Sequence, residues 1–283
     1  MIFCKAAFFC EESMNELQIK YEALKEYFRK AGSAVIAFSG GVDSIFLMKV
    51  ASDVLKEKAV AVTIKSDAFS NREYEEVLAL CREYEFKNEI LQADCFAVDE
   101  FVKNVKDRCY YCKKNFFTKI LDYAESKNIG IVCEGSNMDD TGDYRPGMKA
   151  VAELGVQSPL KECGLYKEEI RLLSKELGLS TWNKSSFACL ATRIGYGEII
   201  NKHKLEMIDS GEQVLYELGF KQFRVRLYGE NSARIEIYTE DFEKLLENRE
   251  YILNKFKEAG FIYVSLDLQG FRSGSMNEAI KTL

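Results

Sequence analysis

The chain has 283 residues, a length that fits one or two domains. Hydrophobic residues make up 47% of the sequence and charged residues 30%, as in ordinary soluble globular proteins, and only two prolines occur, which argues against long disordered linkers. The net charge of −6 argues against a general nucleic-acid binder, because non-specific affinity for nucleic acids comes mostly from cations that meet phosphates.

The first part of the chain, to about residue 180, alternates between helical patterns and short apolar runs typical of buried strands. We predict helices over 12–31, 45–55, 73–84, 111–126 and 167–177, and strands over 34–38, 59–64 and 129–133. A glycine turn over 39–44 joins the first strand to the second helix, and a loop over 134–147 follows the last strand. Strands that alternate with helices indicate an α/β fold with a doubly wound parallel sheet, which we assign to a domain over 1–180.

The pattern changes after about residue 180. Two segments of strictly alternating polarity, 223–228 and 233–238, are separated by 229–232 and predict a β-hairpin. A helical segment over 241–259 and a strand over 261–268 follow. These elements indicate a second, smaller α+β domain over 181–283.

Nine cysteines and one histidine limit the chemistry of any metal site. The single histidine, His203, nearly excludes a histidine-built metal site or a histidine-based catalytic triad. The apolar runs are far too short to span a bilayer, and residues 1–10 lack the apolar core and cleavage site of a signal peptide. We therefore expect a cytoplasmic protein with reduced thiols and no membrane partner.

The sharpest motif is Ser-Gly-Gly-Val-Asp-Ser over 39–44, between a predicted buried strand and a helix. Its glycines let main-chain N–H groups approach an anion, and the start of the next helix favours phosphate, although a plain strand–helix turn is the alternative. A Walker loop would need Gly-Lys-Ser/Thr, and this segment has no lysine. The motif resembles the PP-loop of the ATP pyrophosphatases. That resemblance implies that ATP is bound by Ser39, Gly40, Gly41, Asp43 and Ser44, with Asp43 helping to place Mg²⁺.

Two further motifs contain cysteine. Cys109 and Cys112 lie in RCYYCK at the start of a predicted helix, a spacing that can bind zinc, hold an iron–sulfur cluster or serve redox chemistry. The thioredoxin-like context of the redox motif is absent, and two buried thiols that face different ways are the structural alternative. Cys189, in ACLATR over 188–193, lies beside cations and is either a low-pKa thiolate or a buried structural cysteine.

In this order, the motifs resemble the LarE family, ATP-dependent sulfur transferases that build the nickel-pincer nucleotide cofactor. The resemblance covers nearly the whole chain. It rests on SGGVDS over 39–44, RCYYCK over 108–113, EGSN over 134–137, DYRPG over 143–147, KEEIR over 167–171, ACLATR over 188–193 and GFRSGS over 270–275. Most of these motifs are weak singly, and together they are specific.

The resemblance implies ATP-dependent sulfur transfer to pyridinium-3,5-dicarboxylate mononucleotide, a small-molecule partner. ATP adenylates a carboxylate, pyrophosphate leaves, and a sulfur nucleophile displaces AMP to give a thiocarboxylate. Arg224 and Arg226, which point the same way on one predicted strand, are assigned to the substrate together with Glu212. The alternative for the two arginines is a solvated strand face paired with Glu236.

Two sulfur sources occur in the family, which also tends to form homo-oligomers. One type sacrifices the sulfur of the ACLxxR cysteine, here Cys189, and leaves dehydroalanine. The other type holds a 4Fe-4S cluster on three cysteines and adds sulfide to the free iron. With Cys109, Cys112 and Cys189 present, we favour the cluster type, which needs a sulfide donor. A zinc site would want a fourth ligand, which Cys133 or Cys163 could supply.

Three other functions compete with this interpretation. Other PP-loop proteins with three-cysteine clusters thiolate tRNA, which would need a basic RNA-binding surface, and the net charge of −6 weighs against one. An amidotransferase-like adenylating ligase would not need the cysteines. A non-catalytic nucleotide sensor with a structural metal would release no pyrophosphate.

Overall fold

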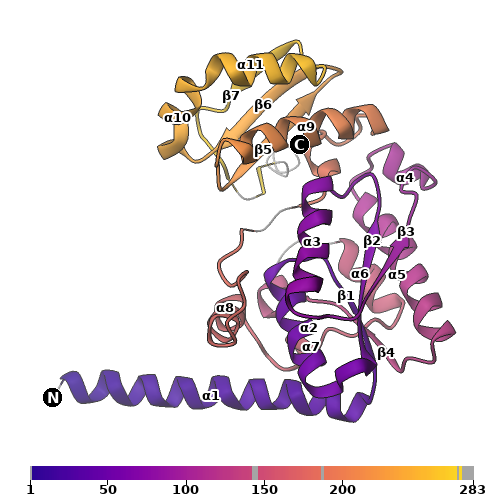
Figure 1. Ribbon diagram of the computed structural model, residues 1–283, viewed down its shortest axis with the longest axis vertical. Coiled ribbons are helices and arrows are strands. Elements are labelled where there is room, and N and C mark those ends of the chain that lie inside the picture. Colours follow the sequence, from indigo (N-terminus) through magenta and orange to yellow (C-terminus); the bar gives the residue numbers. More distant parts are fainter. Residues whose placement is uncertain (1, 142–145, 186–187, 273, 276–283) are drawn as a thin grey trace. The chain divides into compact units, whose positions relative to one another are not determined.

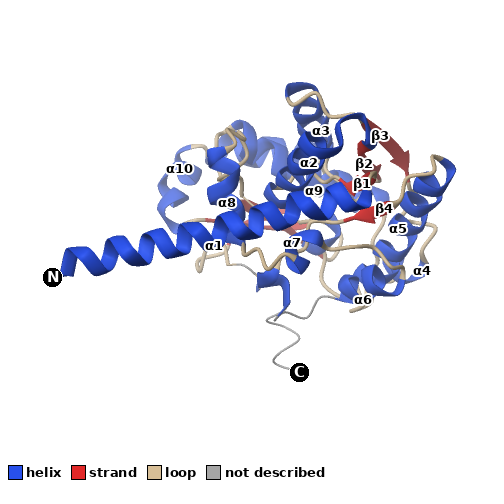
Figure 2. Cartoon of the chain, turned by 90° about the horizontal axis from the view of Figure 1, so that it is seen from below, coloured by secondary structure: helices blue, strands red, loops and turns tan. Residues whose placement is uncertain are grey.

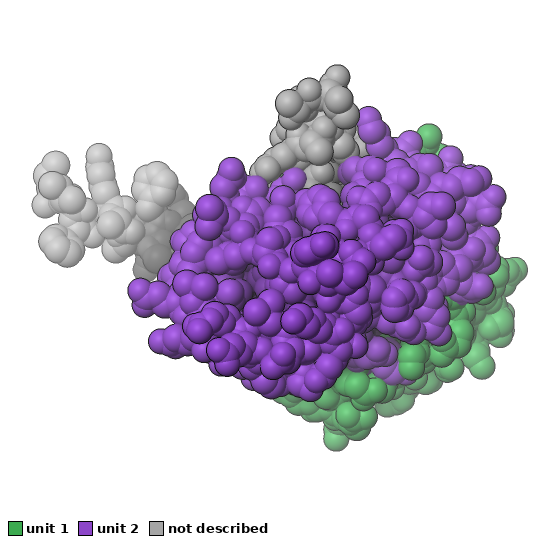
Figure 3. All heavy atoms as spheres, turned by 90° about the horizontal axis from the view of Figure 1, so that it is seen from above, with its two compact units in different colours: residues 1–65, 75–93, 113–184 green, residues 66–74, 94–112, 185–283 purple. Residues whose placement is uncertain are grey.

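The computed structural model describes residues 2–141, 146–185, 188–272 and 274–275 (Figures 1 and 2). The chain forms two compact units, coloured separately in Figure 3. Unit 1 comprises Met1–Lys65, Glu75–Ala93 and Lys113–Lys184, and unit 2 comprises Ser66–Tyr74, Asp94–Cys112 and Ser185–Leu283. A domain boundary near residue 180 stays a prediction from the sequence. Two segments from the first half of the chain are grouped with unit 2, which the sequence pattern did not indicate.

The sheet of unit 1 has four parallel strands in the order β3-β2-β1-β4 (Figure 1). Its strands are β1 (Ala34–Ala37), β2 (Ala59–Lys65), β3 (Asn88–Gln92) and β4 (Ile131–Cys133). In the central strand, Ile36 is in register with Ala61 on one side and Cys133 on the other. The predicted parallel α/β architecture is therefore confirmed, and β3 is an additional strand at the edge of the sheet.

Helices surround this sheet, and two of them, α3 and α5, are divided between the units. The helices with residues in unit 1 are α1 (Ile2–Ala31), α2 (Val42–Leu55), α3 (Asn71–Glu83), α5 (Arg108–Ser126), α6 (Pro146–Glu153), α7 (Pro159–Glu162) and α8 (Lys167–Glu176). The helix α1 is one long helix that extends ten residues beyond its predicted start at residue 12, because residues 2–11 contain neither glycine nor proline (Figure 2).

The core of unit 1 forms where strand residues pack against helices. Val35, Val60 and Val62 of the sheet share a buried cluster with Phe117 and Ile120. The helix α2 is mostly apolar and is buried along most of its length, apart from an exposed side with Lys49 and Asp53. This packing fixes the start of α2 directly after the carboxyl end of β1, where the glycine motif lies.

Unit 2 contains a three-stranded sheet in the order β5-β6-β7. The strands β5 (Phe223–Tyr228) and β6 (Ser232–Ile237) form the predicted antiparallel hairpin, and β7 (Tyr263–Leu266) lies parallel to β6. The helices with residues in this unit also include α4 (Asp99–Val102), α9 (Lys202–Glu217), α10 (Phe242–Glu247) and α11 (Arg249–Glu258). The segment 241–259 was predicted as one helix, but it divides at Asn248, whose side chain donates to the Lys244 carbonyl at 2.8 Å.

Alternating residues of β5 give the sheet of unit 2 an apolar and a polar face. Val225 is fully buried against the helices, and the polar residues Arg224 and Arg226 take the opposite face. Gly211 lets α9 approach this sheet, because a Cβ atom there would lie 3.3 Å from Val225 Cγ1. Cys95 belongs to the same apolar cluster, which explains why residues 94–112 are grouped with this unit.

Among the described helices, none combines the length and the hydropathy that a membrane span requires.

Candidate active site

The glycine motif over 39–44 forms a sharp turn between β1 and α2. Gly40 has a φ of +71°, and a Cβ atom at this position would lie 2.7 Å from Val77 Cγ2, so both the backbone angle and the space require glycine. Ser44 Oγ donates to the Gly41 carbonyl at 3.0 Å and lies 3.3 Å from Ser39 Oγ. The turn thus brings the predicted nucleotide-binding residues together at the N-terminus of a buried helix.

Asp43 lies in the first turn of α2 and is held from two sides. Asn137 Nδ2 donates to Asp43 Oδ1 at 3.2 Å, and Lys167 Nζ donates to Asp43 Oδ2 at 2.5 Å. Asn137 follows β4, the parallel neighbour of β1, and carboxyl ends of neighbouring parallel strands meet at one edge of a sheet. Asn137 and Lys167 both lie in motifs that carry the family resemblance, but neither residue was predicted for the site. The strand order could have identified Asn137, but no sequence signal indicated the contact of Lys167.

The loop after β4 adds carboxylate groups to this edge of unit 1. Glu134 is buried and accepts hydrogen bonds from Ser136 Oγ at 2.7 Å and Ser158 Oγ at 2.6 Å. Asp139 accepts the Lys167 backbone N–H at 2.7 Å, which ties the start of α8 to the loop. Carboxylate and hydroxyl oxygens such as those of Asp43 and Ser44 are the hard donors that Mg²⁺ prefers, and Mg²⁺ commonly needs one or two carboxylates plus phosphates. These residues fit such an ion.

The three predicted cysteines all belong to unit 2, together with a fourth, Cys95. Cys109 and Cys189 are exposed, Cys112 is half-buried, and Cys95 is 0% exposed. Cys112 packs against the apolar cluster that contains Cys95 and Leu190. The Leu190 backbone N–H donates to the Ala68 carbonyl at 3.0 Å, and the Ala68 N–H interacts with the Cys95 thiol. No motif or spacing in the sequence pointed to Cys95.

The thiols of unit 2 lie near enough to affect one another's pKa values. Burial raises the pKa of Cys95 to about 12, and the nearby Cys189 adds to the rise. Burial likewise raises the pKa of Cys112, followed by the effects of Cys189, Cys95 and Cys109. Although Cys189 is exposed as a residue, protein atoms crowded around its thiol raise its pKa, and Arg108 opposes the rise. Burial of the thiol therefore acts against the low-pKa thiolate expected for Cys189.

The thiols suit a soft metal by their chemistry, although they are not arranged around one. No group of three or more His, Cys, Asp or Glu side chains within the described residues is placed to hold a metal ion. Thiolates are nevertheless the usual ligands of iron–sulfur clusters and of zinc, and these thiols lie close enough to interact. Cys133 and Cys163, considered as fourth zinc ligands, belong to unit 1, whereas Cys95 is the additional thiol of unit 2.

Arg226 is buried in an ion-pair network. It donates to both carboxylate oxygens of Glu236, at 3.1 and 3.0 Å, and to the Thr192 carbonyl at 2.6 Å and Ser275 Oγ at 2.8 Å. Arg226 is 7% exposed and Glu236 is 0% exposed, so the predicted alternative of a solvated strand face is wrong, although the expected partner is correct. A buried carboxylate needs this compensation, which Arg234 completes at 2.8 Å.

Arg224 lies on the same face but has a different environment. Its guanidinium lies over the Phe271 ring at 5.2 Å and donates to the Phe223 carbonyl at 2.7 Å. The pKa of Arg224 is lowered to about 10, mainly by burial and also by the positive charges of Arg193 and Arg226, against the effect of Glu212. Such a concentration of buried positive charge favours an anionic ligand.

Glu212, also predicted for the substrate, is fixed by Arg193. Arg193 donates to both carboxylate oxygens, at 2.7 and 2.9 Å, and the Val225 backbone N–H donates at 3.1 Å. Burial alone would raise the pKa of Glu212, but the charge and hydrogen bonds of Arg193 outweigh it and lower the pKa below its usual value. Arg193 also donates to the Ala188 carbonyl at 2.8 Å and so connects Glu212 to the loop that carries Cys189.

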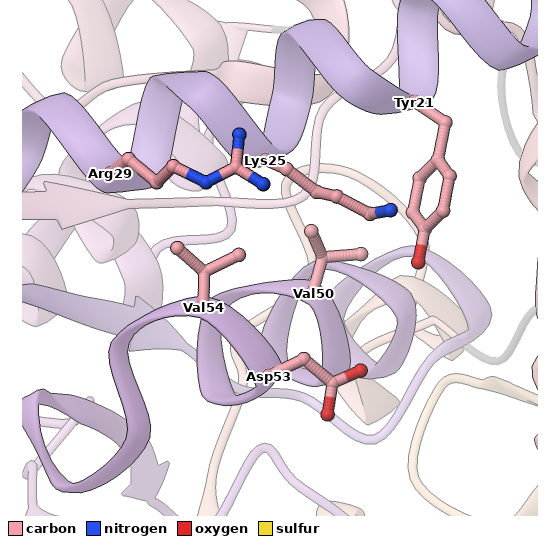
Figure 4. A pocket seen from close by; sticks show the side chains of 6 residues that line it. All are labelled: Tyr21, Lys25, Arg29, Val50, Asp53 and Val54. Carbon is pink, nitrogen blue, oxygen red and sulfur yellow. The ribbon is translucent and has the colours of Figure 1, made fainter.

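A cavity of about 370 Å³ lies in unit 1 between α1 and α2 (Figure 4). It is lined by Tyr21, Lys25, Arg29, Val50, Asp53 and Val54, none of which is a predicted site residue. Its carboxylate is paired with Lys49 at 2.6 Å, and Lys25 lies 4.1 Å from the centre of the Tyr21 ring. The cavity therefore belongs to the helix packing and not to the candidate site.

Comparisons with known proteins place these residues in context. A model of the PP-loop domain matches residues 13–142. An uncharacterized protein of Synechocystis is 37% identical over 266 residues, which cover 93% of this chain and 99% of the relative. The pyridinium-3,5-bisthiocarboxylic acid mononucleotide synthase of Lactiplantibacillus plantarum is 33% identical over 268 residues, 94% of this chain and 97% of that enzyme. An uncharacterized protein of Methanocaldococcus jannaschii is 32% identical over 250 residues, 88% of this chain and 94% of the relative.

Proposed function

Since the chain belongs to the LarE family of PP-loop, ATP-dependent sulfurtransferases, we propose that it transfers sulfur to a carboxylate of pyridinium-3,5-dicarboxylate mononucleotide. The observation that carries this proposal is the 33% identity to the Lactiplantibacillus plantarum synthase over 94% of the chain, since a bisthiocarboxylic acid is made from carboxylates. A carboxylate is a poor electrophile, so sulfur can replace its oxygen only after activation. ATP supplies that activation as an acyl adenylate.

The residues of unit 1 perform the adenylation. A carboxylate oxygen of the substrate attacks the α-phosphorus of ATP, the bond to the bridging oxygen breaks, and pyrophosphate leaves. The N–H groups of Gly40 and Gly41 and the N-terminus of α2 favour the phosphates, and the Ser44 hydroxyl adds a further donor. Asp43 and Ser44 would hold Mg²⁺, which neutralises phosphate charge when bound.

The residues of unit 2 supply the sulfur. Cys109, Cys112 and Cys189 would hold a 4Fe-4S cluster, which would supply sulfur at the oxidation level of sulfide. The thiols must lose their protons when they bind iron, and the raised pKa values of Cys112 and Cys189 make this loading dependent on pH. Sulfur attack on the acyl carbon then breaks the bond to AMP and leaves a thiocarboxylate.

The anionic groups of the substrate have a candidate partner in Arg224. Burial, and after it the positive charges of Arg193 and Arg226, lowers the pKa of this guanidinium, and a bound anion would compensate its charge. Arg226 and Glu212 support it indirectly, because each is fixed by a buried partner, Glu236 or Arg193. We assign phosphate or carboxylate binding to Arg224 and positioning to the other two.

A second candidate function is the sacrificial transfer of the Cys189 sulfur. It is favoured by the lack of a preformed metal-binding group among the described side chains. In that reaction Cys189 would lose one H₂S and become dehydroalanine, and each chain would act once.

Product analysis under anaerobic conditions tests the proposed function. The protein, loaded with iron and sulfide, is incubated with ATP, Mg²⁺ and the dicarboxylate mononucleotide, and nucleotides and pyridinium products are separated by chromatography. We expect equal amounts of AMP and pyrophosphate that depend on the mononucleotide, together with a thiocarboxylate. ADP as the main product, or AMP formation that ignores the mononucleotide, would reject the proposal.

A further inference from the structure

The PP-loop has no lysine of its own, but two lysines from later in the chain contact it within unit 1. Lys167 Nζ donates to Asp43 Oδ2, and Lys184 Nζ donates to the Gly40 carbonyl at 3.1 Å. Lys184 also pairs with Glu76 at 2.8 Å. Each ammonium group is thus placed at one side of the turn that receives the phosphates.

The helix α8 positions both lysines. Lys167 is its first residue, and the backbone N–H of Lys167 donates to Asp139 at 2.7 Å. One turn further, Arg171 donates to the Trp182 carbonyl at 2.7 Å and to the Lys184 carbonyl at 3.1 Å. The same helix therefore presents one lysine directly and holds the backbone of the other.

Both lysines remain accessible to a ligand. The side chain of Lys167 is 30% exposed and that of Lys184 is 21% exposed. Each lysine has a carboxylate partner, Asp43 or Glu76, which an anionic ligand can replace as the partner of an ammonium group. A lysine is a compact point charge with three donors, well suited to phosphate.

We propose that Lys167 and Lys184 bind the β- and γ-phosphates of ATP and the departing pyrophosphate, the role that a lysine inside the loop has in a Walker motif. This rests on the adenylation proposed above. Lys167 exchanges Asp43 for a phosphate oxygen, and the carboxylate of Asp43 becomes available to a metal ion. The added charge stabilises pyrophosphate as a leaving group, because negative charge develops on it when the α-phosphorus bond breaks.

Equilibrium binding of three ligands tests this proposal. The affinities of α,β-methylene-ATP, inorganic pyrophosphate and AMP are measured by calorimetry with Mg²⁺ for wild type, Lys167→Met and Lys184→Met. A lost charge-assisted contact corresponds to about 10-fold to 100-fold in affinity, so we expect such losses for the first two ligands and less than about 2-fold for AMP. Lys161→Met, at an exposed lysine of α7, is the matched control and should bind all three ligands like wild type. Lys167→Arg, which keeps the charge, should recover part of the loss.

Equal losses for AMP and pyrophosphate would overturn the proposal, since they would indicate a general distortion of the loop, and so would unchanged affinities. A second measurement uses only the wild-type protein, in case a variant does not fold. Lysine acetylation is followed by mass spectrometry with and without pyrophosphate. We expect pyrophosphate to reduce the acetylation of Lys167 and Lys184 but not that of Lys161. An equal effect of pyrophosphate on the acetylation of all three lysines would contradict the proposal. Neither measurement involves the pyridinium compound, so a failure of the proposed sulfur acceptor remains distinguishable.

Discussion

The nucleotide-binding turn of unit 1 and the thiols of unit 2 differ in how far their groups are already arranged to bind a ligand. In the turn, Gly40 already has its left-handed backbone, and Asp43 already has two hydrogen-bond partners. The thiols of Cys95, Cys112 and Cys189 have raised pKa values, and no described group of thiols is arranged as a metal site. A site built from backbone and neutralised side chains can form without its ligand, whereas neighbouring thiolates repel one another until a cation compensates their charge.

We expect the largest effect from a substitution in the nucleotide-binding turn of unit 1. Asp43→Ala should lower the rate of pyrophosphate release at least about 100-fold, because a positioned electrostatic group typically contributes 10² to 10³. The measurement is a coupled pyrophosphate assay with the mononucleotide present. Asp53→Ala, on the exposed side of the same helix, is the control and should release pyrophosphate normally. Full activity of Asp43→Ala would mean that the turn does not bind the reacting phosphates.

The next prediction separates the two regions. Cys109→Ala and Cys112→Ala should lose thiocarboxylate formation but keep mononucleotide-dependent pyrophosphate release, since we assign the adenylation to unit 1. Iron content and visible absorbance after anaerobic reconstitution should fall in both variants.

Cys95→Ala is the matched control within the same group of thiols, because it removes a buried neighbour of Cys189 that we do not assign to the cluster. It should keep its iron. Loss of iron in this variant would make Cys95 a ligand and favour a four-thiol site such as zinc. Sulfur transfer by Cys109→Ala and Cys112→Ala at the wild-type rate would contradict the proposal that a cluster supplies the sulfur.

A third prediction concerns the polar sheet face of unit 2. Arg226→Ala leaves Glu236 with less compensation in a buried position, and breaking such a pair should lower the free energy of unfolding by about 3 to 5 kcal/mol. Denaturant unfolding measures this loss. Arg249→Ala, at an exposed arginine of α11, should stay within about 0.5 kcal/mol of wild type. A change at Arg226 as small as that at Arg249 would show that the network contributes nothing to stability.

The smallest expected effect is a pH dependence from Glu212. Its pKa is lower in the folded chain than in the unfolded chain, so its stabilising contribution is fully present above the unfolded value of about 4.3. That contribution is lost as the pH falls from there through the folded value. As the pH falls through this window, the free energy of unfolding should therefore decrease more steeply for wild type than for Glu212→Gln. Denaturant unfolding at a series of pH values measures this slope. Parallel curves for the two proteins would contradict the assignment.

The parts of the molecule that sequence predicted are those governed by local rules. The glycines of the 39–44 turn, the apolar strands β1 and β2 and the alternating hairpin of unit 2 each have a pattern that depends on neighbouring residues alone. The family motifs added the residues that we propose for the site. These features fix the fold class and the nucleotide-binding turn.

The rest depends on contacts between distant segments. The strand β3 lies at the sheet edge and is half-exposed, so its sequence lacks the apolar run of a central strand. From the sequence alone, the alternating charges of β5 look exposed to solvent. In the structure Arg226 is buried, and its partners Glu236 and Ser275 come from later segments of the chain. The contact of Lys167 with Asp43 spans 124 positions, and no local pattern encodes it.

The most direct test of the central claim, that this chain transfers sulfur repeatedly from a cluster, is the amount of thiocarboxylate formed per chain, with the intact mass of the protein measured afterwards. The reaction contains reconstituted protein, ATP, Mg²⁺, the dicarboxylate mononucleotide and excess sulfide, without oxygen. The account predicts several thiocarboxylates per chain and an unchanged polypeptide mass. At most one thiocarboxylate per chain, with a loss of about 34 Da that corresponds to one H₂S, would show instead that Cys189 is consumed.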